Sequence, residues 1–445
     1  MKSIDMTRGP ILRQLVSFSL PLVFGNLFQL MYNMVDTIVI GRFAGSNALA
    51  AVGTCDPVMT LLINAISGLC VGASVLMSRF FGARDMQRLK DEMRTVLWMG
   101  LAAALVVLAV GLGCSRMILT ALSVPEEILP LSLIYLRVIF VGMPFTCLYN
   151  IYAAALRAVG DSRTPLRYLI ISSVTNMALD LIFVGLFRLD VFGAGLATVI
   201  AEAVSVLLCI RYVTRNVPSL HVSWRGLAPD MSLAGDTLRY GGLTALQSCA
   251  QPLGNLMIQS TINGLSVAAI AAYNSVRKIE DIGLLPGRSI GTAMMTFTAQ
   301  NEGAKAHVRT HDGYRRGMVL EALASAAVCL FIWFMRRPLM LLFTADEAII
   351  AEGLRYYAVC SFMYWLPCLN NGRQGYFRGT RRMGISLGGT LTQITLRVIS
   401  SFILVPRLGI VGVGISCVVG WAAMMAWQAP LRMILEKKCT PQQTA

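Results

Sequence analysis

Long apolar stretches recur along the whole chain and constrain its fold more than any other feature. The hydrocarbon core of a bilayer is about 30 Å thick, and a helix needs roughly 20 apolar residues to cross it. About twelve such stretches can be read, and they lack the apolar and polar alternation of barrel strands. We therefore predict an all-α polytopic membrane protein with twelve transmembrane helices. The predicted spans are 15–41, 50–78, 95–118, 130–156, 166–187, 191–210, 240–262, 267–299, 317–342, 354–377, 383–405 and 409–431.

The composition agrees with a membrane as the solvent of this chain. Hydrophobic residues make up 56% of the 445 residues and charged residues only 14%, which an ordinary soluble domain could not keep in water. Residues 1–10 lack a charged region leading to a cleavage site, so we expect the first apolar stretch to be a retained helix.

The positive charge is distributed unevenly between the predicted loops. The formal net charge is +15, and the loops on one side of the predicted bundle carry about 25 of the 38 Lys and Arg residues. The loops on the other side carry about seven, so the positive-inside rule predicts that both termini are cytoplasmic, in a bacterial inner membrane. This distribution argues against a nucleic-acid partner.

Motifs that would indicate an enzyme or a resident metal are weak. The eleven cysteines include no CxxC pair, and His307 and His311 have no further ligands near them in the sequence. Gly384, Ser386 and Gly388 match GxSxG, but a nucleophile elbow needs a strand before the motif, and here the motif opens an apolar helix. We therefore expect no enzyme, no cofactor and no metal beyond a possible transported sodium ion.

The sequence repeats itself at an offset of 221 positions. Six helices per repeat give both halves the same orientation, which predicts two six-helix lobes related by a pseudo-twofold axis along the membrane normal. We expect an N-terminal lobe over 1–210, a cytoplasmic linker over 211–239 and a C-terminal lobe with a short tail over 240–445. The offset pairs Tyr135 with Tyr356, Cys147 with Cys368, Asn150 with Asn371 and Arg157 with Arg378.

A few carboxylates fall inside the predicted spans of the first lobe. A charge in hydrocarbon costs at least about 2.5 kcal/mol, so each one needs a partner or a function. Asp36, Asp180 and Thr198 lie at about the same depth below the outer boundary, and Asn176 and Glu202 share helix faces with Asp180 and Thr198. We expect these groups to converge on one polar site. A buried hydrogen-bonded network that only locks the helices together is the alternative.

The second lobe lacks these carboxylates. The offset pairs Asp36 with Met257 and Asp180 with Ser401, which favours ion coupling in the first lobe rather than a structural need shared by both. In the second lobe Arg277 is expected to neutralise Glu280 or Asp281 on its own helix, with an ion pair to Asp56 as the alternative.

Four stretches resemble the multidrug and toxic compound extrusion (MATE) family. They read PLVFGNLFQLMYNMVDTIVIGRFAGSNALAAVG from Pro21, GLCVGASVLMSRFFG from Gly68, LRAVGDSRTP from Leu156 and NMALDLIFVGLFRLDVFGAGLATVIA from Asn176. The resemblance implies a secondary active exporter that exchanges amphipathic, cationic drugs for protons or sodium by alternating access. We also expect a monomer that contacts small amphipathic molecules and membrane lipids.

The same resemblance assigns roles to single residues. Asp36, Asn176, Asp180 and Thr198 match the cation-coupling positions, and Pro21 matches the kink of the first helix. Gln29, Tyr32, Tyr135 and Asn150 match cavity or substrate positions, and Glu202 adds a further carboxylate.

Two questions stay open at the level of the sequence. Buried carboxylates suit a proton, while the oxygens of Asn176 and Thr198 also suit sodium, so both coupling ions fit. A flippase for a lipid-linked precursor is the alternative function, although a flippase should have a basic cavity and the first-lobe groups are acidic.

Overall fold

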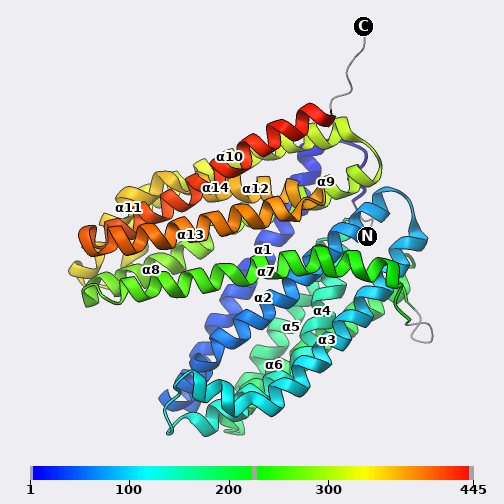
Figure 1. Ribbon diagram of the computed structural model, residues 1–445. Coiled ribbons are helices and arrows are strands. Elements are labelled where there is room, and N and C mark those ends of the chain that lie inside the picture. The colour runs from blue at the N-terminus through cyan, green and yellow to red at the C-terminus, as the bar shows by residue number, and fades with distance from the viewer. Residues whose placement is uncertain (1–3, 223–227, 440–445) are drawn as a thin grey trace. The chain divides into compact units, whose positions relative to one another are not determined.

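Every regular element in the described part of the chain, residues 4–222 and 228–439 of the computed structural model, is a helix (Figure 1). The fold is built from long apolar helices whose backbone hydrogen bonds are satisfied internally, as a membrane requires. The helices are α1 (Ile11–Val39), α2 (Ser46–Gly82), α3 (Met86–Ala121), α4 (Leu129–Ala158), α5 (Arg163–Asp180), α6 (Asp190–Asn216), α7 (Met231–Ile262), α8 (Val267–Gly283), α9 (Leu285–Gly303), α10 (His307–Leu341), α11 (Glu347–Cys360), α12 (Trp365–Gly379), α13 (Met383–Leu408) and α14 (Ile410–Cys439).

Each of the twelve predicted spans falls on one helix or on two consecutive helices, so the prediction of an all-helical membrane protein is confirmed. Within the described residues, nine helices are long and apolar enough to cross a membrane. The other three spans correspond to α7, to α8 followed by α9, and to α11 followed by α12. The last two are interrupted near their middle, at Leu284 and at Ser361–Met363.

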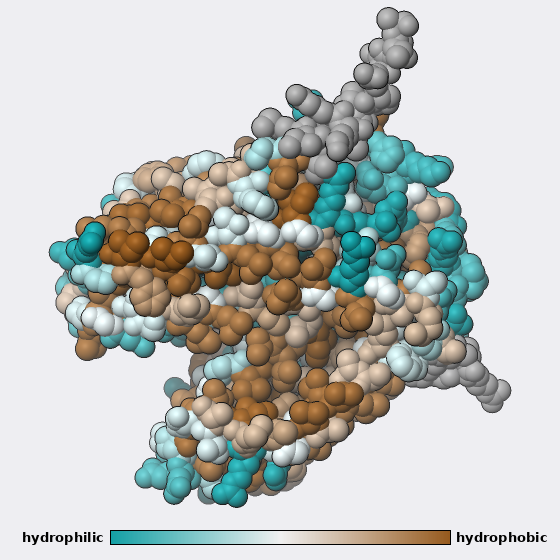
Figure 2. Space-filling model, viewed as in Figure 1, coloured by the Kyte–Doolittle hydropathy of each residue, from teal (hydrophilic) through white to brown (hydrophobic). Residues whose placement is uncertain are grey.

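Large apolar side chains are exposed along these helices. Val106 is 61% exposed, Met117 67%, Leu186 72% and Phe334 70%. Figure 2 shows hydrophobic side chains over wide areas of the visible face, with hydrophilic side chains gathered near helix ends. Such surfaces are stable against lipid and not against water.

The first compact unit comprises Met1–Asp5 and Pro21–Ala245. Within it α4 packs against α2, α3 and α6, and α5 packs against α6. Short π-helical turns, Ile40–Ala44 after α1 and Leu181–Leu186 after α5, contact each other.

The second compact unit comprises Met6–Leu20 and Leu246–Ala445. Its closest helix pairs are α13 with α14 and α9 with α12, and a buried apolar cluster includes Ile258, Tyr273 and Val413. The α9 and α12 backbones approach closely at glycines: a Cβ on Gly375 would overlap the carbonyl oxygen of Gly291.

The internal repeat is visible in the backbone. Positive φ angles recur at the same offset of 221 positions, although most of the residues concerned are not glycine. A non-glycine residue with positive φ is uncommon, so this recurrence supports a duplicated unit. The pairs are Arg84 (61°) with Lys305 (57°), Gly160 (88°) with Arg381 (61°), and Arg188 (54°) with Gly409 (59°).

Helices extend into the predicted linker from both sides. α6 runs to Asn216 and α7 begins at Met231, and residues 223–227 lie outside the described part of the chain. The predicted lobe boundaries stay a prediction.

Candidate functional site

Asp36 and Asp180 lie near the ends of two α-helices of the first unit, just before irregular turns. Asp36 stands three residues before the end of α1, and Asp180 is the last residue of α5. A π-helical turn follows each helix. Such turns often occur at functional sites, because the extra residue per turn redirects the neighbouring side chains.

The carboxyl groups of Asp36 and Asp180 lie within hydrogen-bonding range of each other. Asp180 is fully buried. Two carboxylates held this close in a poorly polarisable environment repel each other, so the pair is stable only when a proton or another cation lies between them.

Asn176 and Thr198 join this pair. The Asn176 side-chain amide donates a hydrogen bond to the Thr198 hydroxyl at 3.3 Å, which fixes α5 against α6. Thr198 Oγ1 also donates to the carbonyl of Ala194 at 3.1 Å.

The site has an excess of acceptors. Among the described residues, no donor reaches Asp36 Oδ1, either carboxyl oxygen of Asp180, or Asn176 Oδ1, although all four atoms are buried. A buried acceptor without a donor loses its hydration without compensation. The residues present therefore fit a proton or a small hard cation as the missing partner.

A second group of side chains borders the site. The Tyr32 hydroxyl lies near the side chain of Thr198, and the buried Tyr135 lies within electrostatic range of Asp36. Glu202 lies within electrostatic range of Tyr32. All nine predicted site residues other than Pro21 belong to the first unit.

Thr146 on α4 is a functional candidate that the sequence did not identify. Its hydroxyl donates to Glu202 Oε2 at 2.5 Å, and its carbonyl accepts from the Asn150 amide at 2.8 Å. One turn of α4 thus holds both Glu202 and Asn150. A threonine in an apolar helix gives no signal of its own, because it commonly bonds back to its own helix.

Three predicted residues are not joined to the rest of the group by a side-chain hydrogen bond among the described residues: Tyr135, Gln29 and Pro21. Gln29 is exposed on α1. Pro21 lies inside α1 at the first residue of the first unit's long segment, where its missing N–H weakens the helix.

The expected neutralisation of Arg277 on its own helix is not found. Asp281 pairs instead with Arg288 at 3.4 Å, and Glu280 accepts hydrogen bonds from Tyr356 at 2.9 Å and Tyr364 at 2.7 Å. The i, i+3 and i, i+4 spacings allow the expected pairs, but residues brought in from α9, α11 and the turn before α12 provide other partners.

Other sequence motifs have ordinary structural roles. His307 lies 3.2 Å from Glu302, and no group of three metal-ligating side chains occurs among the described residues. Ser386 of the GxSxG match is buried inside α13, where it hydrogen-bonds with Gln247.

A duplicated six-helix unit with an acidic, donor-poor site inside one helix bundle has the architecture of a secondary membrane transporter. Comparison with known proteins agrees. The model of the MatE family matches residues 21–182 and again 244–403, once in each repeat. The chain belongs to the MATE family of transporters, which are not enzymes.

Curated relatives and solved structures resemble the chain along most of its length. The probable multidrug resistance protein YpnP of Bacillus subtilis is 26% identical, over 91% of this chain and 89% of that protein. YoeA of the same organism, also named a probable multidrug resistance protein, is 29% identical over 81% and 79%. A MATE transporter solved in an outward-facing conformation covers 99% of both chains with a TM-score of 0.92 and 23% identity. A Pyrococcus furiosus transporter described as having a binding pocket of reverse polarity has a TM-score of 0.91 and 24% identity, also over 99% of both chains.

Proposed function

We propose that this transporter exports amphipathic, cationic small molecules in exchange for protons or sodium ions by alternating access. The observation that carries the proposal is the Asp36 and Asp180 pair, whose three donor-free oxygens lie with the donor-free amide oxygen of Asn176. A site of this kind alternates between a cation-bound state and a charged state. The two states differ in electrostatic free energy, so they can be linked to two conformations.

The exchange of the driving cation for a cationic substrate follows from the charge of the Asp36 and Asp180 pair. When Asp36 and Asp180 hold a cation, the negative charge of the pair is reduced and it attracts a cationic substrate only weakly. When the ion leaves, the carboxylates attract the substrate's positive charge. Tyr32, Tyr135 and the Glu202 carboxyl provide aromatic and polar contacts beside the pair.

The relatives support the substrate class. Several are named multidrug resistance or multidrug export proteins, MepA of Staphylococcus aureus among them, at 25% identity over 77% of this chain. We extend this class to the chain as part of the proposal, with a bacterial inner membrane and cytoplasmic termini as its setting.

Substrate uptake into inside-out membrane vesicles tests the proposal. Proton and sodium gradients are imposed separately, and accumulation of a fluorescent cationic dye is followed. The proposal expects accumulation against the dye gradient with at least one of the two ions. Accumulation that is the same with and without either gradient contradicts it.

A further inference from the structure

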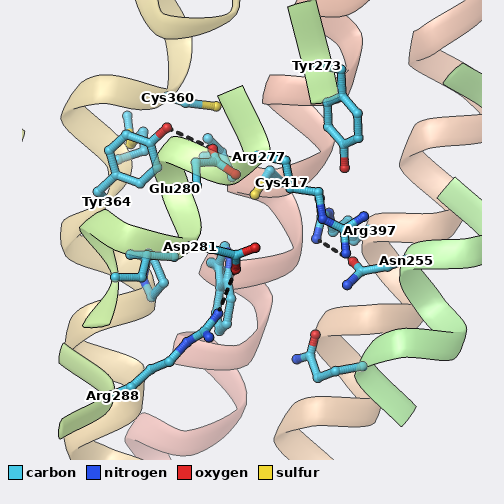
Figure 3. Close-up of a pocket in the computed structure, with 16 residues that line it drawn as sticks. Asn255, Tyr273, Arg277, Glu280, Asp281, Arg288, Cys360, Tyr364, Arg397 and Cys417 are labelled. Carbon is cyan, nitrogen blue, oxygen red and sulfur yellow. Dashed lines mark hydrogen bonds and ion pairs between the residues drawn. The ribbon is translucent and has the colours of Figure 1, made fainter. Parts of the chain in front are cut away.

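The second unit contains a pocket of about 110 Å³ that the proposed cation exchange does not use. Figure 3 shows the polar groups that surround it. The helices that form it are interrupted at its wall: Leu284 separates α8 from α9, and Tyr364 directly precedes α12. Irregular backbone at membrane depth is tolerated where it lines a polar cavity, so the interruptions mark this pocket as a site rather than a packing defect.

Two repeat partners of acidic-site residues line this pocket. The offset that pairs Asp180 with Ser401 also pairs Asn176 with Arg397, and Asp36 with Met257. At the offset of 219 that aligns the last helices, Thr198 pairs with Cys417. Arg397 and Cys417 both line the pocket. The repeat has therefore exchanged carboxylates for uncharged side chains and an amide for a guanidinium.

The charges lining the pocket do not cancel. Three guanidinium groups, of Arg277, Arg288 and Arg397, face two carboxylates, of Glu280 and Asp281. Asp281 is paired with Arg288, and Glu280 accepts hydrogen bonds from two tyrosine hydroxyls. Among the described residues, no carboxylate lies in an ion pair with Arg277 or Arg397. One positive charge is left over.

Arg397 is also poorly satisfied. Its Nη1 reaches the Asn255 amide oxygen only at 3.4 Å, and its buried Nε has no acceptor among the described residues. Arg277 and Arg397 both lie within electrostatic range of the Tyr273 hydroxyl, so the two like charges share one region of the pocket. Glu280 also lies within electrostatic range of Arg397, but it is one carboxylate beside two guanidinium groups. A buried charge that is left over is costly, and an anion beside the two guanidinium groups would remove that cost.

The aromatic and apolar residues that line the rest of the pocket indicate which kind of anion would bind there. Tyr273, Tyr364 and Trp421 provide aromatic surface, and Val418 and Pro367 provide apolar surface. A planar carboxylate attached to a ring suits this lining, since a guanidinium binds a carboxylate through two parallel hydrogen bonds while the ring packs on aromatic groups.

We propose that the Arg277 and Arg397 pocket of the second unit binds the carboxylate of an aromatic, amphipathic substrate. This inference rests on the proposed function only in treating the ligand as a transport substrate. It widens the substrate class from cations to zwitterions and organic acids.

Calorimetric titration of the purified full-length protein in lipid nanodiscs tests the pocket directly, without any ion gradient. The probes are naphthalene-2-carboxylate and its neutral carboxamide, which share the ring and differ in charge. We expect the carboxylate to bind at least about tenfold more tightly than the carboxamide, the difference expected from charge-assisted hydrogen bonds. Equal binding of the two probes overturns the proposal.

Three arginine variants assign the binding to this pocket. Arg277→Gln and Arg397→Gln should each weaken carboxylate binding by about tenfold or more. Arg336→Gln is the control, because Arg336 stacks on Trp333 and does not line the pocket. If Arg397→Gln fails to fold, Arg277→Gln alone is used for the test. It is expected to fold, because Arg277 makes no hydrogen bond among the described residues that the substitution would break. Wild-type carboxylate affinity in a folded Arg277→Gln protein overturns the proposal.

One further variant separates this inference from the proposed function. Asp36→Asn should abolish gradient-driven export yet leave carboxylate binding within about twofold of wild type. Suppose that Asp36→Asn loses carboxylate binding while Arg277→Gln and Arg397→Gln both keep it. The anion then binds at another site, and the inference is overturned. A different outcome separates the two claims. If the wild-type protein binds the carboxylate through the two arginines but exports no substrate under either gradient, the inference is supported and the proposed function is contradicted.

Discussion

The Asn176 amide donates its hydrogen bond to the Thr198 hydroxyl at 3.3 Å, and its own oxygen is left facing no donor among the described residues. This orientation keeps an acceptor available beside Asp36 and Asp180. A small interhelical contact between α5 and α6 therefore helps set the number of oxygens offered to a cation.

Removing the Thr198 hydroxyl should weaken the driving ion's binding. In Thr198→Val the Asn176 amide loses its acceptor and is free to rotate, which costs about 1 kcal/mol. We expect the half-saturating concentration of the driving ion to rise about threefold to tenfold in proteoliposomes. Thr175→Val is the matched control, because the Thr175 hydroxyl donates to the Ile171 carbonyl of its own helix and to no other residue in the described part of the chain. Equal effects of the two variants would count against the role of Thr198.

The two repeats should respond unequally to substitution. Met257 is 53% exposed and carries no charge, and the buried Ser401 hydroxyl donates to Ser416 at 2.8 Å. We expect Met257→Ala and Ser401→Ala to retain most of the export measured for wild type at matched expression. Asp36→Asn and Asp180→Asn should lose nearly all of it. Export that falls equally in Met257→Ala and Asp36→Asn would show that the repeats are equivalent in coupling.

The close approach of α9 and α12 should be sensitive to one methyl group. A Cβ at Gly375 would overlap the Gly291 carbonyl oxygen, and backbone atoms cannot move aside as a flexible side chain can. We expect Gly375→Ala to destabilise the protein by about 1–3 kcal/mol and to lower its melting temperature. Gly113→Ala in α3 is the control, since no described atom lies within 4 Å of its added Cβ. Thermal unfolding in detergent, followed with a thiol-reactive dye, measures both.

Much of the fold was predictable from the sequence, because apolar length and Lys and Arg bias are local signals. The convergence of Asp36, Asn176, Asp180 and Thr198 was also predictable, since equal depth on neighbouring helices leaves few other places for them. The partners of Glu280 and Asp281 were not predictable, because they depend on how α8, α9 and α11 pack in three dimensions.

A buried carboxylate on α10 is a second feature that sequence alone could not predict, because its surroundings depend on helix packing. Glu321 is fully buried, and neither of its carboxyl oxygens has a donor among the described residues. The sequence marks it only as one acidic residue in an apolar helix. Its side chain packs beside Gly372 of α12, where an added Cβ would lie 3.1 Å from it.

Replacing Glu321 by methionine should therefore stabilise the protein. A methionine of similar length fills the same space beside Gly372 and removes a buried polar group that has no partner among the described residues. We expect a melting temperature equal to or higher than that of wild type, with export preserved. A lower melting temperature together with lost export would mean that the Glu321 carboxyl itself is required.

Thiol labelling in intact cells tests the predicted orientation. Ser123 lies in the exposed connection between α3 and α4, and Ala83 lies in the exposed connection between α2 and α3. With cytoplasmic termini, a membrane-impermeant maleimide added outside should modify Ser123→Cys and spare Ala83→Cys until the membrane is opened. The reverse pattern would contradict the orientation.

Ion-driven export by purified Asp36→Asn and Asp180→Asn proteins in liposomes tests the central claim most directly. Each variant mimics a carboxyl that never releases its proton, so it should fold and insert but fail to accumulate a cationic dye against its gradient. Its dye binding should also lose the dependence on pH or sodium that wild type has. Uphill transport by both variants with the wild-type ion dependence would contradict the coupling role of this carboxylate pair.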